Sequence, residues 1–263
     1  MKKFILACTA AATLLTTAAN ADFTRVEMGT GVWSQTPNGY ISRDDNDGIF
    51  NLNGTYTSAQ KNSTEFYIWA FIKHPLPLIP NLRLEYVTIA DEGETTGSVD
   101  GLSIPGSAPT TIDMVQYDII PYYNLLDNTF WMTIDVGIDI KIIESDVVVG
   151  AVSSTIPGIE DFPGYSSTDT TIVPFLYLRD RIEIPASSIA LEADAKYITD
   201  GTNTLYDVRA KLDYSFDYMF DIKMLVEPAL EIGYRAQKVR IDDGATQVDI
   251  DYSGLYFGLM LRF

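Results

Sequence analysis

Few residues of this chain have the types and the spacing that catalysis requires. His74 is the only histidine and Cys8 the only cysteine in 263 residues. A histidine works as a general acid or base when an Asp, Ser or Asn side chain orients it. His74 instead begins the stretch 74–80, which contains three prolines and is typical of a rigid turn. We therefore assign no catalytic residue and expect no enzymatic activity.

The sequence also offers few residues that could bind a metal or a cofactor. The run Arg43–Gly48 partly matches the calcium-loop pattern D-x-[DN]-x-[DN]-G, but Arg43 stands at the first ligand position and no glutamate follows at the twelfth. We interpret the run as a polar external turn. The sequence contains no zinc-ligand spacing, phosphate-binding glycine loop or nucleotide signature. We expect no metal and no cofactor.

The amino terminus has the pattern of a secretory signal peptide. Lys2 and Lys3 precede an uncharged, mostly apolar run, and Ala19-Asn20-Ala21 supplies a small-x-small cleavage site. A lipoprotein site at Cys8 is disfavoured because only about four apolar residues precede it, fewer than the ~7–15 of a signal core. The sequence predicts a signal peptide over 1–21 and a single domain over 22–263.

Composition favours a membrane barrel over other classes. After the signal peptide no apolar stretch of about 18 residues remains, so no transmembrane helix is expected. Hydrophobic residues still make up 46% of the chain, too many for disorder. The net charge of −18 argues against binding nucleic acid. A transmembrane β-barrel reconciles these facts because only alternate residues face lipid.

The apolar residues alternate with a period of two, most clearly over Thr129–Ile143. One face holds Phe130, Met132, Ile134, Val136, Ile138, Ile140 and Ile142. The other holds polar residues that include Asp135, Asp139 and Lys141. A helix would wind these charges into the apolar stripe, whereas a strand keeps the two faces apart.

Ten such segments predict an all-β fold, a closed antiparallel transmembrane β-barrel of about ten strands. The predicted strands cover 22–34, 64–73, 81–90, 111–123, 129–143, 169–180, 187–199, 205–216, 223–239 and 246–263. Long polar loops are expected at 35–63, 91–110 and 144–168, with a further short strand at 49–57 left open. Short turns separate the other strands. Long external loops opposite short periplasmic turns are typical of outer-membrane barrels.

Both signs of charge occupy the face opposite lipid. We predict a lumen network of Asp135, Asp139, Lys141, Glu192, Asp194, Lys196, Asp207, Arg209, Lys211, Asp213, Glu231 and Arg235. The same face holds Arg25, Glu27, Arg83, Glu85, Asp118 and Arg262. Barrels of about eight strands have interiors filled by side chains, while open porins use about 16–18 strands. Size therefore favours a filled interior over a narrow, charge-selective conduit.

Aromatic residues near the predicted strand ends fit the two interfacial girdles of a barrel. They are Trp33, Tyr40, Tyr122, Tyr123, Trp131, Tyr177, Tyr197, Tyr214 and Tyr256. The last strand ends on Phe263, and Phe257, Leu259 and Leu261 precede it at alternate positions. We interpret these four residues as an assembly signal for the barrel-assembly machinery.

Four segments carry a resemblance to a known family. They are His74–Tyr86, Tyr122–Asn128, Gly233–Gln237 and the ending Gly254–Phe263. With them the chain resembles a group of small, largely uncharacterised proteobacterial outer-membrane β-barrel proteins. The resemblance covers nearly all of 22–263 and implies the fold and the location, but no activity and no ligand residues.

The combined expectation is a monomeric barrel in the outer membrane of a Gram-negative cell, with both termini in the periplasm. Its partners would be outer-membrane lipids, lipopolysaccharide and the barrel-assembly machinery, and its role structural or passive towards small solutes. Three alternatives stay open: an adhesin or binding protein that uses its long loops, a narrow solute channel, and a soluble periplasmic barrel that binds an apolar ligand.

Overall fold

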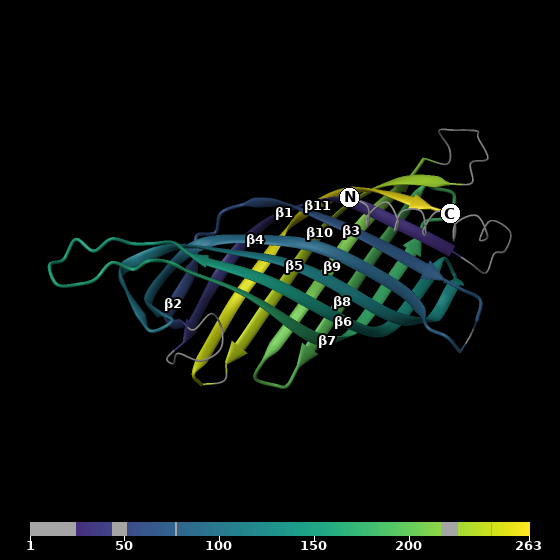
Figure 1. Ribbon diagram of the computed structural model, residues 1–263. Coiled ribbons are helices and arrows are strands. Elements are labelled where there is room, and N and C mark those ends of the chain that lie inside the picture. The colour runs from purple at the N-terminus through teal and green to yellow at the C-terminus, as the bar shows by residue number, and fades with distance from the viewer. Residues whose placement is uncertain (1–24, 44–51, 77, 217–225, 243) are drawn as a thin grey trace, which may run out of the picture.

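The computed structural model describes residues 25–43, 52–76, 78–216, 226–242 and 244–263 (Figure 1). The predicted signal peptide, most of the run Arg43–Gly48 and the start of the segment 49–57 lie outside the described residues. The strands are β1 (Arg25–Arg43), β2 (Leu52–Ser58), β3 (Ser63–Lys73), β4 (Asn81–Val99), β5 (Leu102–Thr129), β6 (Met132–Val149), β7 (Tyr165–Glu183), β8 (Ile189–Thr199), β9 (Thr204–Ser215), β10 (Glu227–Asp242) and β11 (Thr246–Arg262).

These strands form one closed antiparallel barrel. Each strand from β4 to β11 pairs with its neighbour in sequence, and β11 returns to β1, from Glu27 opposite Arg262 to Arg43 opposite Thr246. The strands β2 and β3 both lie between β1 and β4, and each pairs with both. They share one position in the wall, so the barrel has ten strands, and the predicted fold is confirmed.

Alternation along each strand separates an outward apolar face from an inward polar face. On β6, Ile138 and Ile140 are exposed outward, while Asp135, Asp139 and Lys141 are buried inside. The outward band continues around the barrel through residues such as Leu176, Leu255 and Leu259. An outward apolar band around a polar interior is typical of a transmembrane barrel. None of the described residues forms a helix long and apolar enough to cross a membrane.

The two ends of the barrel differ. The first residue of β1 and the last residue of β11 lie at one end, here called the terminal end, and the turns that join β3 to β4 and β7 to β8 lie there too (Figure 1). At the other end, here called the distal end, several hairpins project beyond the rest, and the segment 150–164 between β6 and β7 reaches furthest (Figure 1).

The predicted long loops are wrong over much of their length. The segments 35–43, 91–99, 102–110, 144–149 and 165–168 belong to strands. The strand β2 occupies part of the segment 49–57 that was left open. Glycine, serine and threonine there resemble loop residues, but antiparallel pairings such as that of Thr95 with Ala108 continue the ladders past the apolar band. The long strands build a distal extension.

The distal extension has its own apolar interior. Leu52, Tyr56, Ile89, Val99, Ile104, Ala108, Ile112, Val147, Val149, Val248, Ile250 and Tyr252 are buried in one cluster with residues of the barrel. The segment between β6 and β7 adds Phe162, which is held by a bridge to Val152 and is buried in the same cluster. This interior covers the distal side of the lumen with packed side chains.

Candidate functional site

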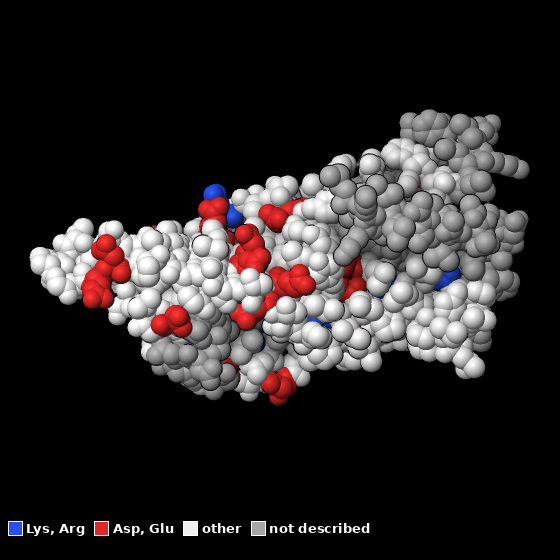
Figure 2. Space-filling view, viewed as in Figure 1, with Lys and Arg blue, Asp and Glu red and all other residues white. Residues whose placement is uncertain are grey.

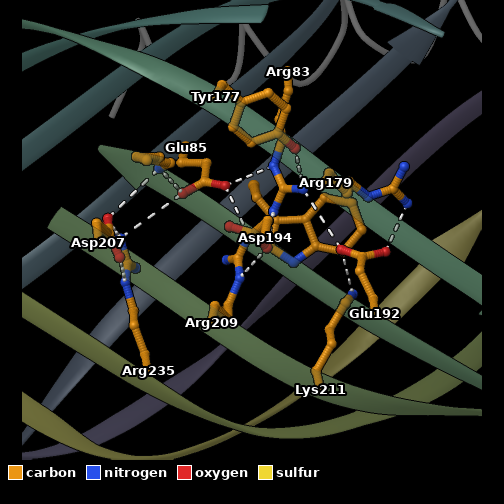
Figure 3. Close-up of polar contacts among 12 residues, drawn as sticks. Arg83, Glu85, Tyr177, Arg179, Glu192, Asp194, Asp207, Arg209, Lys211 and Arg235 are labelled. Carbon is orange, nitrogen blue, oxygen red and sulfur yellow. Dashed lines mark hydrogen bonds and ion pairs between the residues drawn. The ribbon is translucent and has the colours of Figure 1, made fainter. Parts of the chain in front are cut away.

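The charged interior of the barrel is the candidate site. All twelve residues of the predicted lumen network are buried, with side chains that face inward from β6, β8, β9 and β10. Arg83, Glu85 and Asp118 join them from β4 and β5. Figure 3 shows part of this interior, with side chains such as Glu85, Asp194 and Arg209 pointing towards one another.

Glu85 accepts hydrogen bonds from three cations on three strands. Arg83 on β4 lies 2.6 Å from its Oε1, Lys196 on β8 lies 2.8 Å from its Oε2, and Arg209 on β9 lies 2.9 Å from its Oε1. The strand β4 pairs with β2, β3 and β5, but not with β8 or β9. The bonds from Lys196 and Arg209 therefore cross the lumen, and the Arg209 side chain is seen beside Glu85 in Figure 3.

Asp207 on β9 forms a second centre. The Arg235 guanidinium donates two parallel hydrogen bonds to its carboxylate, at 2.9 Å from Nε and 2.6 Å from Nη2. Lys141 and Gln237 add contacts of 3.3 Å and 3.0 Å. Lys141 also lies 2.7 Å from Asp118, which accepts from Lys196 at 2.5 Å. One continuous network thus joins β5, β6, β8, β9 and β10.

Two arginines of β7 complete the network towards the terminal end. Arg179 lies 2.6 Å from both Asp135 and Glu192. Arg181 lies 2.5 Å from Asp213 and 3.1 Å from Glu192. The predicted network lacks both arginines. Arg179 lies within the predicted strand 169–180, and its alternation with the outward-facing Leu178 already indicates an inward position. Arg181 follows the same alternation but lies beyond the predicted end of that strand.

Aromatic side chains fill the space beside the ions. Tyr67 and Trp69 on β3 donate hydrogen bonds of 2.7 Å and 3.1 Å to the same oxygen of Glu231 on β10. Lys211 lies 3.0 Å from Glu231 and 4.7 Å from the centre of the Trp69 ring. Such contacts stabilise a cation that has little water around it.

Four of the expected girdle aromatics prove to be interior residues. Trp33, Tyr122, Tyr177 and Tyr256 are buried. Tyr177 shares the inward face with Arg179, and its hydroxyl accepts a 3.1 Å hydrogen bond from Arg83. The prediction placed them by distance from strand ends, whereas the pleat decides which face a side chain occupies. Tyr40, Tyr123, Trp131, Tyr197 and Tyr214 are exposed.

Charged and apolar side chains occupy different parts of the interior. Ionised side chains cross the lumen in the terminal half, and apolar side chains pack in the distal half. Asp139 is the least satisfied member of the network, since neither of its carboxylate oxygens has a hydrogen-bond partner and Lys196 lies 3.9 Å away. Among the described residues, no group of three or more His, Cys, Asp or Glu side chains is placed to hold a metal ion.

His74 lies in the turn between β3 and β4 at the terminal end. Its Nε2 lies 3.1 Å from the Pro80 carbonyl oxygen, and its Nδ1 accepts a 3.1 Å hydrogen bond from the Leu76 amide. Asn81 Oδ1 accepts from the His74 amide at 3.0 Å. Both ring nitrogens are thus engaged within the turn.

The four residues interpreted as an assembly signal line the last strand. Phe257, Leu259 and Leu261 are exposed on the outward face of β11. Phe263 follows the strand, and its amide donates a 2.9 Å hydrogen bond to the Val26 carbonyl. The last residue is therefore joined to the first strand, next to the closing seam.

Solved structures give the comparison that decides the fold. The outer membrane protease OmpT from Escherichia coli matches 93% of this chain and 98% of its own, with a TM-score of 0.56 and 11% sequence identity. This chain has the fold of an outer-membrane β-barrel. A FadL homologue from Pseudomonas aeruginosa (94% of this chain, 91% of its own, TM-score 0.34, 9% identity) and the translocator domain of the autotransporter NalP from Neisseria meningitidis (100% and 98%, TM-score 0.40, 12% identity) align less closely. No protein-family model and no curated protein sequence matches the chain.

Proposed function

We propose that this protein is a closed, non-enzymatic barrel of the outer membrane, with both termini in the periplasm and a structural role. The single observation that carries the proposal is the set of buried ion pairs that cross the lumen, such as Lys196 with Glu85 at 2.8 Å and Lys141 with Asp207 at 3.3 Å. A porin keeps a water-filled channel, whereas here side chains from opposite walls meet.

A planar-bilayer recording tests the closed state. Purified folded protein should insert without giving steady conductance steps, while a porin in the same bilayers shows them. Insertion is checked independently by recovery of the protein with the lipid. Sustained unitary steps from the folded protein would contradict the proposal and favour the narrow channel.

Residence in the membrane has its own test. The apolar outward band predicts that the protein leaves the membrane fraction only with detergent, and that the folded barrel runs faster than the boiled chain on a gel. Extraction in plain buffer would instead support the soluble periplasmic barrel.

A protease function of the kind named for OmpT finds no support in the placement of the histidine. His74 lies at the terminal end, which we place in the periplasm, and both its ring nitrogens are engaged by the backbone of its own turn. A general base needs a free ring nitrogen beside a bound substrate. Incubation of the folded protein with a mixture of peptides should give no cleavage above that of the H74A variant.

A second candidate function is binding through the distal extension. The segment 150–164 between β6 and β7 projects beyond the rest of the barrel, and acidic side chains lie over the distal half of the visible face (Figures 1 and 2). Exposed carboxylates there include Glu92, Glu94, Asp113, Glu144 and Asp146. In the membrane this surface would meet lipopolysaccharide or an external partner. If the extension binds lipopolysaccharide, replacing Gly97–Gly106 with Asn-Gly should lower the amount that co-purifies without changing the heat-modifiable fold.

A further inference from the structure

One acidic side chain faces outward inside the apolar band. Asp180 on β7 is the one charged residue among the outward positions of the band on β6 to β10. These positions run from Ile134 to Ile142, Ile172 to Ile182, Leu191 to Tyr197, Tyr206 to Tyr214 and Leu230 to Ala236. In the register of the sheet, Asp180 lies opposite Ile134 on one side and Ala193 on the other. A carboxylate that faces lipid is costly unless a cation or a donor reaches it.

Nothing within the described part of the chain satisfies this carboxylate fully. The Oδ1 atom of Asp180 is buried and has no hydrogen-bond partner. The inward acids differ, because Asp194 and Glu192 on the neighbouring strand lie within 3 Å of arginines. Asp180 as a whole is only half-buried, so its carboxylate can still be reached from the outer face by a partner outside this chain.

A hollow lies beside Asp180 on the same outer face. It has a volume of about 380 Å³, and its floor is made by the small residues Ala193, Ala195 and Ala210, between the larger Leu178 and Tyr234. Small side chains on neighbouring strands leave space that larger ones would fill. The hollow extends from Asp180 towards the distal end, since Ala195 pairs with Leu178, two residues before Asp180 on β7. Its shape and lining suit one alkyl chain.

Asp180 lies inside the apolar band, a short distance from the level of the headgroups. It lies three residues before the end of β7, roughly 10 Å along the strand. The exposed Trp131 marks that end, because its carbonyl accepts a 2.9 Å hydrogen bond from the Glu183 amide. Exposed tryptophans sit at the level of lipid headgroups in membrane barrels. A cation attached to a lipid of the adjacent leaflet can therefore reach Asp180 while its chain enters the hollow.

We propose that Asp180 and the alanine-lined hollow bind a phospholipid with a primary ammonium headgroup, of the phosphatidylethanolamine type. The ammonium donates to the carboxylate oxygen of Asp180 that is not buried, and one acyl chain covers Ala193, Ala195 and Ala210. A second copy of this chain fits less well, because the outward band of β6 to β10 offers no lysine or arginine to Asp180. The proposal rests on the membrane residence in the proposed function, but it does not depend on whether the lumen conducts.

Native mass spectrometry of the full chain in detergent, with added lipid, tests this site. We expect the protein to retain phosphatidylethanolamine about tenfold better than phosphatidylglycerol with the same acyl chains, the effect of one charge-assisted hydrogen bond. Asp180→Asn should abolish this preference, while the matched variant Asp146→Asn, at an exposed acid of the distal extension, should keep it. Equal retention of the two lipids by the wild type, or an unchanged preference in Asp180→Asn, would overturn the proposal.

The hollow is tested separately. Ala210→Leu should reduce retention of both lipids several-fold, since the added side chain fills the space for the acyl chain. A gel for heat-modifiability, run on each variant, shows that the barrel is folded. Unchanged lipid retention in folded Ala210→Leu would remove the hollow from the site. If the lipid preference is absent while the wild type remains heat-modifiable, the lipid site fails and the proposed function stands.

Discussion

At the scale of single residues, the buried charges of the interior are stabilised because nearly every one has a partner of opposite sign on another strand. Glu85 shows the arrangement, with cations from β4, β8 and β9 around one carboxylate. Removing a charge from water is expensive, and an opposite charge at hydrogen-bond distance offsets that cost only when both partners are present. Loss of one partner therefore costs more than the pair contributes.

Lys196→Met should lower the free energy of unfolding by about 3–5 kcal/mol, the usual effect of removing one partner from a buried pair. Lys196 lies 2.8 Å from Glu85 and 2.5 Å from Asp118, and both acids would keep their charge in a dry interior. Urea unfolding in lipid bilayers measures the change. The control Lys238→Met breaks a partly exposed pair with Asp249 and should cost below about 1 kcal/mol. A similar small loss for Lys196→Met would mean that water replaces the ammonium.

The buried Asp91 should make the stability of the distal extension depend on pH. It lies beyond Ala90, the last outward apolar residue of β4, and Ser58 donates to it at 2.8 Å. Burial raises the pKa of Asp91 above its ordinary value, so the folded state binds a proton that the unfolded state has already lost. Its burial therefore destabilises the fold increasingly as the pH rises above about 4.

Asp91→Asn should accordingly raise the unfolding temperature at pH 7, and this gain should shrink towards zero below about pH 4. Heat-modifiability gels over a pH series measure it. Asp113→Asn, at an exposed acid on β5, serves as the control and should change little. A lower unfolding temperature for Asp91→Asn at pH 7 would show that the carboxylate is paired in the charged form.

At the scale of elements, strand length separates the membrane part from the extension. The β4–β5 hairpin continues from the band to Val99 and Leu102, where buried Val99 packs with Leu52 of β2. The ladder thus carries apolar residues outwards and buries them in the interior of the extension. The β8–β9 hairpin, by contrast, stops at Thr199 and Thr204.

Replacing Gly97–Gly106 with Asn-Gly should loosen the extension and leave the barrel intact. The change removes Val99 and Ile104 from the apolar cluster, so Leu52 becomes exposed. Limited proteolysis should cut the distal extension several times faster, while the membrane part stays heat-modifiable because its own pairings are unchanged. Loss of heat-modifiability would show that the extension is needed to close the barrel.

The end of the last strand should affect how efficiently the barrel is assembled in the outer membrane. If Phe263 belongs to an assembly signal, its deletion should reduce the amount of folded protein in the outer membrane several-fold, while the fraction that folds keeps its unfolding temperature. Within the described part of the chain, its backbone hydrogen bonds are the two that it forms with Val26. Phe66→Ala is the control, since Phe66 is an outward aromatic away from the chain end. Equal yields of the two variants would argue against the signal.

At the scale of the whole molecule, closure of the barrel turns the charged inner faces of its strands towards one another, and the proposed function requires that little water enters between them. Ten strands give a lumen close to the size that side chains can fill, and here ion pairs and apolar residues fill it together. Salt screens exposed charges over about 8–10 Å, but it has little effect on pairs that water does not reach.

The unfolding temperature should therefore change little between about 0.1 M and 1 M NaCl, although the Debye length falls from about 10 to 3 Å. Scanning calorimetry in a non-ionic detergent measures it, with Lys238→Met included to separate the contribution of an exposed pair. A strong loss of stability in salt would indicate a wet lumen and would favour the narrow channel.

The sequence by itself determined the class of fold and the face on which most charges lie. A period of two is a local property, so it assigns Ile138 outward and Asp139 inward without any knowledge of neighbouring strands. The same alternation would have assigned Arg179 and Arg181 to the interior. Strand length was less predictable, because small polar residues occur both in loops and in strands that continue past a membrane.

Only the tertiary structure decided which charges pair. Lys196 and Glu85 lie 111 residues apart in the chain, and they meet because the barrel closes and brings β4 opposite β8. No local pattern in the sequence shows that two residues so far apart in the chain come into contact. The same holds for Asp180: the sequence shows an acid among apolar residues, but its free oxygen and the alanine hollow beside it depend on how β7, β8 and β9 lie together.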